Sequence, residues 1–241
     1  MDEIEKLNLL DHVDDINKLL ARYGVNFSLY KNNVFKEQLF PFDAIPRVIK
    51  AEEFDYFEKG LKQRVRALNA FLNDIYGKKE IVKDHVIPED FIFISKGYMA
   101  ECEGVLPPKG IYNHISGIDL VKGKDGHWYV LEDNLRVPSG ASYPLIAREI
   151  TRICSPDAFR KLKIEDNRDY AKILKATMDH VNCGGINVVL TPGRNNAAFF
   201  EHAYLAEKIG ATLVTGNDLF VENNICYSLN YDGTKEKVGA I

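Results

Sequence analysis

The sequence predicts a protein of the α/β class. Segments with apolar residues at every third or fourth position predict helices, and shorter runs of alternating or continuous apolar residues predict strands. The second half of the chain has the order strand, helix, strand, which is typical of a βαβ unit. With 46% hydrophobic residues among 241, the chain can bury a substantial core.

The chain is expected to begin with a helix that is followed by a hairpin. Apolar residues recur at helical spacing over residues 4–20, and Gly24 lies where such a helix can end. Residues 25–42 then alternate apolar and polar side chains around the turn-forming residues 31–33. This alternation predicts two short strands that lead into a proline-bounded segment.

The longest helical pattern covers residues 51–76. Its apolar positions repeat every three or four residues, and Gly77 follows where a left-handed helix cap is expected. Downstream, the apolar residues 91–95 (FIFIS) predict a short strand. The other side of the long helix carries charged residues that are typical of a solvated face, namely Lys62, Arg64, Arg66 and Asp74.

Two β-rich runs within residues 117–134 flank an Asp-Gly pair. Such a pair between two candidate strands is a strong local signal for an antiparallel hairpin, with Asp125 and Gly126 as the two central residues of the turn.

The second half of the chain predicts a Rossmann-like βαβ unit. Residues 186–191 predict a buried strand, residues 197–209 a helix that Gly210 caps, and residues 211–216 a further strand. The PGRNN loop between the first strand and the helix could offer Arg194 and backbone N–H groups to an anion, but an ordinary βα turn explains it better.

A polar, charged stretch near residues 155–168 predicts the domain boundary. We therefore expect one domain over residues 1–154 and a second, partial Rossmann-like domain over residues 155–241.

Composition excludes some classes of function. The formal net charge of −4 gives no basic field for nucleic acid or an anionic membrane surface. The four cysteines are far apart and lack metal-ligand spacing, which is typical of free thiols in a reducing compartment. No apolar run reaches the ~20 residues that cross a bilayer, and the acidic start is unlike an export signal. A cytoplasmic protein that acts on small molecules is the expectation.

The predicted hairpin brings three oxygen ligands together. Counting outward from the turn sets Asp119 directly opposite Glu132, and strand alternation returns Asn134 to the same face while Asp133 points away. Facing carboxylates repel, so one of them is protonated or a cation neutralises the pair. Oxygen ligands suit Mg²⁺, and Arg136 beyond them could hold a phosphate or a carboxylate. The alternative is an exposed edge hairpin with casual salt bridges.

Four stretches resemble the circularly permuted ATP-grasp family, the group related to glutathionylspermidine synthase. The resemblance covers most of the chain, and EDNLRVPSG is its most specific part. The four stretches are PFDAIPRVI, QRVRALNAFLNDIYG, GIDLVKGKDGHWYVLEDNLRVPSGASY and LTPGRNNAAFFEHAYLAEKIGATLVTGNDLFV.

The resemblance implies a circularly permuted ATP-grasp fold and an ATP-dependent carboxylate–amine ligase that works through an acyl phosphate. It places the Mg²⁺ ligands on Asp119, Glu132 and Asn134, the same three residues that the hairpin count selects. Arg136 is then a candidate to hold the phosphate or acyl phosphate. The substrates would be a small carboxylate and an amine or peptide.

Three further residues are candidates with simpler alternatives. Ser139 and Gly140 could donate a hydroxyl and an N–H group to an anionic substrate, although a sharp turn also explains them. His114 could take a polar catalytic role, although a structural histidine is more common.

The sequence departs from the relatives in two respects. Glutathionylspermidine synthase has an arginine where this chain has Gly117, so catalytic details do not carry over at that position. The relatives also continue past the position of Ile241, and the nucleotide-gripping lysines belong to that later part. We therefore expect that a C-terminal portion or a partner chain completes the site. The rival interpretation is a non-catalytic binding or assembly subunit that keeps the scaffold.

Overall fold

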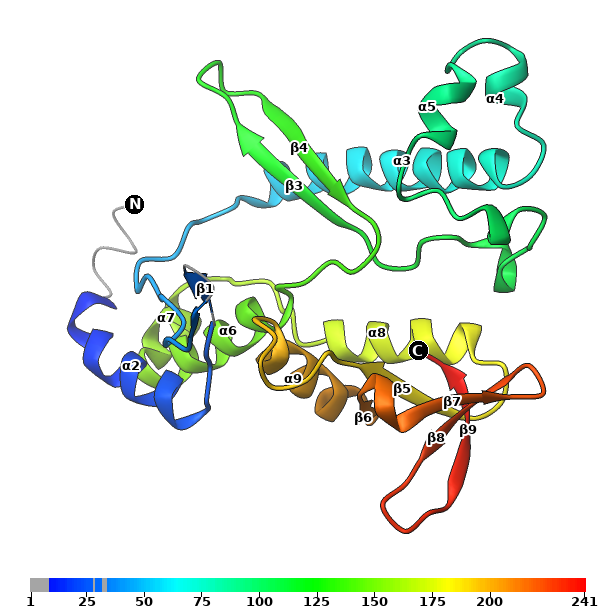
Figure 1. The fold of residues 1–241 in the computed structure, drawn as a ribbon. Coiled ribbons are helices and arrows are strands. Elements are labelled where there is room, and N and C mark those ends of the chain that lie inside the picture. The colour runs from blue at the N-terminus through cyan, green and yellow to red at the C-terminus, as the bar shows by residue number, and fades with distance from the viewer. Residues whose placement is uncertain (1–8, 28, 32–33) are drawn as a thin grey trace. The chain divides into compact units, whose positions relative to one another are not determined.

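The computed structural model describes residues 9–27, 29–31 and 34–241, and they form two compact units (Figure 1). The first unit contains the described residues up to Arg47 together with Ser139–Ile241, and the second contains Val48–Pro138. The domain division at residues 154/155 stays a prediction, and the compact units are divided at other places.

The second unit is built on one long helix. Its elements are α3 (Ala51–Ile75), α4 (Glu80–Lys83), α5 (Glu89–Phe93), η2 (Ala100–Cys102), η3 (Pro108–Gly110), β3 (Gly117–Lys122) and β4 (Trp128–Asn134). The predicted helix and hairpin are therefore both present, and they pack on one another.

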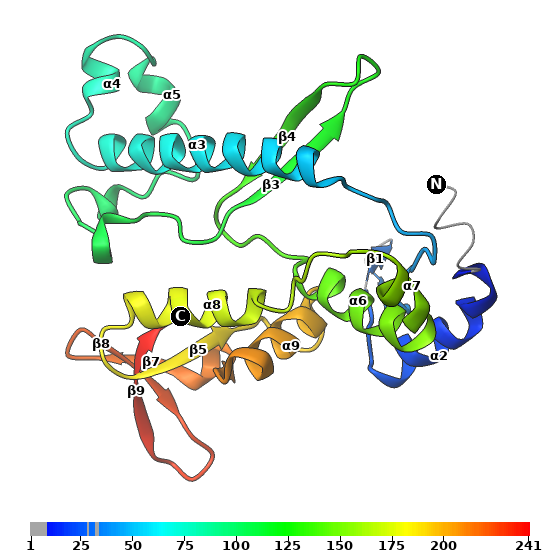
Figure 2. The ribbon, with the colours of Figure 1, turned by 180° about the vertical axis from the view of Figure 1, so that it is seen from behind.

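Aromatic and charged contacts hold the hairpin against α3. The rings of Phe57 and Trp128 meet edge to face with centroids 4.7 Å apart, and Lys122 Nζ lies 2.9 Å from Glu53 Oε1. In both views of the fold the hairpin crosses this helix obliquely (Figures 1 and 2). These two contacts join the hairpin to the first two turns of α3.

Residues 91–95 do not form the predicted strand, because α5 occupies the first three of them and ends at Phe93. Pro88 precedes this helix, and Glu89 and Asp90 lie in its first turn, where acidic residues favour a helix start. Of its residues only Ile92 is buried, and none of the sheets among the described residues includes this apolar run.

The expected left-handed cap at Gly77 is also wrong. The left-handed residue after α3 is Lys79, at φ 57°. Asp74 accepts hydrogen bonds from the N–H groups of Glu80 (3.0 Å) and Ile81 (2.9 Å), and it thereby caps α4. Gly77 is needed for another reason, since a Cβ there would lie 2.6 Å from the carbonyl oxygen of Asn73.

The first unit joins helices to a five-stranded sheet. Its helices are η1 (Leu9–His12), α2 (Val13–Arg22), α6 (Ser142–Cys154), α7 (Pro156–Lys161), α8 (Tyr170–Val181), α9 (Phe199–Ile209) and η4 (Gly216–Asp218). Its strands are β1 (Leu29–Lys31), β2 (Val34–Lys36), β5 (Ile186–Leu190), β6 (Thr212–Val214), β7 (Leu219–Glu222), β8 (Ile225–Leu229) and β9 (Lys235–Ala240).

The predicted βαβ unit is confirmed. The sheet has the order β6-β5-β9-β8-β7, with β5 parallel to both β6 and β9. Helix α9 connects β5 to β6 and ends at Gly210, whose φ of 68° is the left-handed cap that the sequence predicts. The N-terminal hairpin is confirmed as the antiparallel pair β1–β2, and its turn lies outside the described residues. Residues 1–8, where the predicted first helix begins, also lie outside them.

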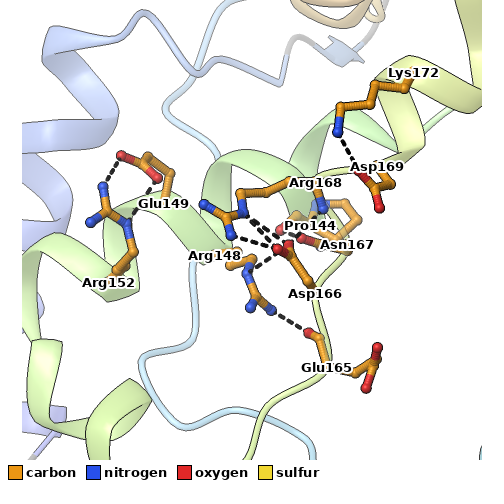
Figure 3. Close-up of polar contacts among 10 residues, drawn as sticks. All are labelled: Pro144, Arg148, Glu149, Arg152, Glu165, Asp166, Asn167, Arg168, Asp169 and Lys172. Atoms are coloured by element: carbon orange, nitrogen blue, oxygen red, sulfur yellow. Dashed lines mark hydrogen bonds and ion pairs between the residues drawn. The ribbon is translucent and has the colours of Figure 1, made fainter.

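The polar segment before α8 is tied to α6 (Figure 3). Arg148 NH1 donates to the carbonyl oxygen of Glu165 at 2.6 Å, and its Nε lies 3.8 Å from Asp166. Asp166 also binds Arg168 through its side chain and backbone, which holds the pKa of Asp166 well below its usual range. The segment that predicted a domain boundary is therefore integrated into the first unit.

Among the described residues, none of the helices combines the length and the apolar character that a membrane crossing requires.

Candidate active site

The hairpin pairs Asp119 with Glu132, as the sequence predicts. The turn itself differs, because Gly123 N–H donates to the carbonyl oxygen of His127 (2.8 Å) and Gly126 N–H to that of Gly123 (3.0 Å). The loop therefore contains three residues, and Gly126 takes the left-handed conformation at φ 83°.

A β-bulge restores the expected register. Leu120 pairs with Val130, while Asp119 pairs with Glu132, so Leu131 is one extra residue in β4. The predicted two-residue turn is wrong by one position, and the bulge shifts the strand by one position in the opposite sense. The two differences cancel at the carboxylate pair.

The three proposed metal ligands share the exposed face of the hairpin. Asn134 Nδ2 donates to Glu132 Oε1 at 3.0 Å, which places these two side chains together. A hydrogen bond with Glu132, together with some loss of solvation and the repulsion of that carboxylate, raises the pKa of Asp119. A cation bound between the two facing carboxylates would relieve their repulsion.

Asp133 points to the other face, as predicted. It accepts two hydrogen bonds from Arg64 of α3, at 2.7 Å from Nε and 2.5 Å from NH2. These bonds lower the pKa of Asp133. The interpretation of Arg64 as part of a solvated face is therefore wrong, because a bidentate ion pair joins it to the hairpin.

The donor set fits a hard cation. Two carboxylates and an amide oxygen on one open face leave room for water and phosphate oxygens, which is the coordination that Mg²⁺ prefers. A cluster of three His, Cys, Asp or Glu side chains able to hold a metal ion is absent from the part of the chain that the structure describes. A bound Mg²⁺ here would depend on Asn134 and on substrate oxygens besides Asp119 and Glu132.

His114 lies just before the hairpin begins in the sequence, and Arg136 lies just after it ends. Arg136 is exposed two residues beyond the end of β4, and His114 is exposed in the segment before β3. Between them, the backbone at Gly117 runs close to the chain that leaves β4, since a Cβ there would lie 2.7 Å from Cβ of Pro138. The position where glutathionylspermidine synthase has an arginine thus has no room for a side chain.

Ser139 and Gly140 belong to the first unit, and Gly140 already has an anionic partner. Its N–H group donates to both carboxylate oxygens of Glu201, at 2.7 and 2.8 Å. Glu201 is 3% exposed and also accepts hydrogen bonds from the N–H group (2.9 Å) and hydroxyl (2.7 Å) of Ser142. Binding a substrate anion through Gly140 N–H would require this carboxylate to leave, whereas Ser139 is exposed.

The PGRNN loop uses several of its groups internally. Gly193 N–H donates to Thr191 Oγ1 (3.2 Å), and Ala198 N–H donates to Asn196 Oδ1 (2.9 Å) at the start of α9. Thr191 Oγ1 also lies 2.9 Å from Nδ1 of His202, whose pKa is lowered by burial. The neighbouring Glu201 binds Gly140 and Ser142, so Glu201 and His202 have different hydrogen-bond partners.

The sequence interpretation missed two asparagines that support the hairpin, Asn69 on α3 and Asn113 in the segment before β3. Asn69 lies on the apolar stripe of that helix, and an amide in such a stripe is the signal that could have found it.

The fold and this site define an α/β protein whose helix-backed hairpin can present oxygen ligands to a metal ion. The family model of circularly permuted ATP-grasp type 2 matches residues 46–241, and the chain belongs to this family. The resemblance and the fold class that the sequence predicts are confirmed.

Relatives extend well beyond the matched region. An uncharacterised protein of Synechocystis sp. is 44% identical over 88% of this chain and 45% of its own length. An uncharacterised protein of Mycobacterium tuberculosis is 38% identical over 92% of this chain and 40% of its own. A Frankia casuarinae protein named "Putative glutamate--cysteine ligase 2-2" is 38% identical over 77% of this chain and 22% of its own. The chain spans less than half the length of these relatives.

Proposed function

We propose that this chain contributes a metal-binding edge, the metal edge of Asp119, Glu132 and Asn134, to an ATP- and Mg²⁺-dependent carboxylate–amine ligase. The observation that carries the proposal is the shared face of Asp119, Glu132 and Asn134 on a hairpin of an ATP-grasp family member. The substrates would be a small carboxylate and an amine or peptide, and the reaction would take place in the cytoplasm.

The proposed reaction has two steps. A carboxylate oxygen of the substrate attacks the γ-phosphorus of ATP and an O–P bond forms, while the bond from the γ-phosphorus to its bridging oxygen breaks and ADP leaves with those electrons. The amine nitrogen then attacks the acyl carbon, a C–N bond forms, phosphate leaves with the electrons of the C–O bond, and the amine loses a proton. The name of the Frankia relative describes a ligation of this kind, between glutamate and cysteine.

The residues of this chain would hold and neutralise charge. Asp119, Glu132 and Asn134 would bind Mg²⁺, which screens the phosphate oxygens when it is bound. Arg136 would bind the transferring phosphate, and His114 and Ser139 remain candidates for polar contacts with the substrate. The groups that grip the nucleotide would come from a C-terminal portion or a partner chain.

Calorimetric titration with ATP, with and without Mg²⁺, tests the proposal. We expect Mg²⁺-dependent binding that Glu132→Gln weakens on the order of 10-fold, because one oxygen ligand loses its charge. Glu58→Gln is the matched control, since Glu58 lies on α3 and pairs only with Lys62 at 2.8 Å among the ion pairs of the described residues. Equal binding by Glu132→Gln and the wild type would refute the metal edge.

A second candidate function is a non-catalytic binding or assembly subunit. The surface around α5 favours it, since Val86, Phe91 and Ile94 are 69%, 75% and 78% exposed. Phe91 and Ile94 also line an apolar pocket of about 450 Å³. Self-association that Phe91→Ser abolishes, together with an absence of ATP binding, would favour this function over ligation.

A further inference from the structure

Asn69 links α3 to the segment that enters the hairpin. Its Oδ1 accepts hydrogen bonds from the N–H groups of Tyr112 (3.0 Å) and Asn113 (2.9 Å). Its Nδ2 donates to the carbonyl oxygens of Asn113 and Val65, both at 3.2 Å. All four hydrogen-bonding positions of this amide are used, so its orientation is fixed.

Asn113 links the beginning of the hairpin to its end. The residue is 8% exposed, and its Nδ2 donates to the carbonyl oxygens of Ile115 (3.1 Å) and Leu135. Its Oδ1 accepts a hydrogen bond from the hydroxyl of Ser116. Leu135 directly follows Asn134, so one buried amide fixes both the entry into β3 and the exit from β4.

Arg64 holds the hairpin from the same helix, five residues before Asn69. Its bidentate pair with Asp133 lies between Glu132 and Asn134 in the sequence of β4. Asn134 therefore lies between two anchored residues. The Asp133 side chain binds Arg64 of α3, and the Leu135 carbonyl binds Asn113, which Asn69 of α3 holds. The remaining freedom of Asn134 is restricted by its hydrogen bond to Glu132.

We propose that Asn69, Asn113 and Arg64 are positioning residues of the metal edge. They hold the ends of β3 and β4 at one separation, so that the oxygens of Asp119, Glu132 and Asn134 converge before a cation arrives. A preorganised set of ligands binds more tightly, because less conformational entropy is lost when the ion binds. The inference rests on the proposed function, since it assumes that these oxygens bind a cation.

Binding of Mn²⁺ alone to the 241-residue chain, followed by the electron paramagnetic resonance signal of the free ion, tests the inference without any nucleotide. We expect Asn69→Ala to weaken Mn²⁺ binding about 10-fold, within the range found for residues that orient metal ligands. Arg64→Lys keeps the positive charge but loses the bidentate geometry, and a loss of about 3-fold is expected. Arg64→Lys still tests the inference if Asn69→Ala does not fold.

Asp74→Ala is the matched control for a purely structural role. It removes two hydrogen bonds from the same unit, at α4, and leaves the hairpin untouched. We expect it to lower the unfolding midpoint and to leave the Mn²⁺ affinity of the folded protein unchanged. If Asn69→Ala and Arg64→Lys also keep the wild-type affinity, the three residues support only the fold, and the inference is overturned.

Glu132→Gln separates this failure from failure of the proposed function. Loss of Mn²⁺ binding in Glu132→Gln, with unchanged binding in the positioning variants, would overturn the inference alone. A wild-type chain that does not bind Mn²⁺, or a Glu132→Gln chain that binds it as tightly as wild type, would overturn the metal edge and the inference together.

Discussion

At the scale of single residues, Glu201 shows how a buried charge can be stabilised within the protein. Its carboxylate lies at the N-terminus of α6 and accepts hydrogen bonds from Gly140 and Ser142. Backbone N–H groups and the helix dipole favour a negative charge at this position. A helix end that could bind an external anion is therefore occupied by a carboxylate from α9.

Glu201→Gln should lower the free energy of unfolding by about 1–3 kcal/mol, because the amide group turns N–H donors toward the donors of Gly140 and Ser142. Urea denaturation followed by circular dichroism measures the change. Glu207→Gln, at an exposed position of the same helix, is the control and should have little effect. Equal stability of the two variants would contradict the assigned role of Glu201.

At the scale of elements, the β3–β4 hairpin shows how turn and strand geometry combine. Its three-residue loop requires Gly126 at φ 83°, and the extra Leu131 bulges out of β4. Both features are local, yet together they decide which side chains face one another. The β7–β8 hairpin shows the same dependence on its turn, where Asn223 and Asn224 take left-handed conformations at φ 51° and 62°.

A pair of glycine substitutions in the second unit should change stability in opposite directions. Gly126→Ala should lower the free energy of unfolding by about 1 kcal/mol, because a Cβ is strained at this positive φ. Gly60→Ala should raise it by up to about 1 kcal/mol, because Gly60 lies inside α3 with nothing within 4 Å of a Cβ. Thermal unfolding compares the two variants, and a shift of the same sign in both would contradict the assigned turn geometry.

At the scale of the whole molecule, the first unit is assembled from segments far apart in the chain. Tyr143 of α6 stacks on Phe40 with ring centroids 4.3 Å apart and lies 5.7 Å from the ring of Phe200. Its hydroxyl donates to the carbonyl oxygen of Asn26 at 3.2 Å. Burial, reinforced by the charge of Glu201, raises the pKa of Tyr143 to about 12.

This pKa predicts a loss of stability in alkali. The folded pKa of about 12 lies above the unfolded value of 10.0, so the stabilisation is complete below pH 10 and disappears as the pH rises toward 12. The loss amounts to at most about 3 kcal/mol. Urea unfolding of the wild type and Tyr143→Phe between pH 8 and 11 measures it, and the wild type should lose stability relative to the variant above pH 10. A constant difference between the two proteins would contradict the prediction.

Sequence patterns predicted most of the fold wherever one periodicity extended over a long segment. Helix α3 and the βαβ unit agree with the prediction because their apolar residues repeat without interruption. The short apolar run at residues 91–95 fits either a strand or a helix, and its lack of a partner strand decided in favour of α5. The lengths of the turns were harder to predict, because the number of residues in a hairpin loop depends on which hydrogen bonds form between its two strands.

The sequence by itself determined the α/β class, the ATP-grasp resemblance and the pairing of Asp119 with Glu132. These features depend on local periodicity and on motifs of contiguous residues. Only the tertiary structure decided that Arg64 binds Asp133, that Asn69 and Asn113 support the hairpin, and that Glu201 occupies the N-terminus of α6. The physical reason is distance along the chain, since 44 to 69 residues separate the helix from its hairpin partners and Glu201 acts on α6 from 59 residues away. Such contacts form only when packing brings separate elements together.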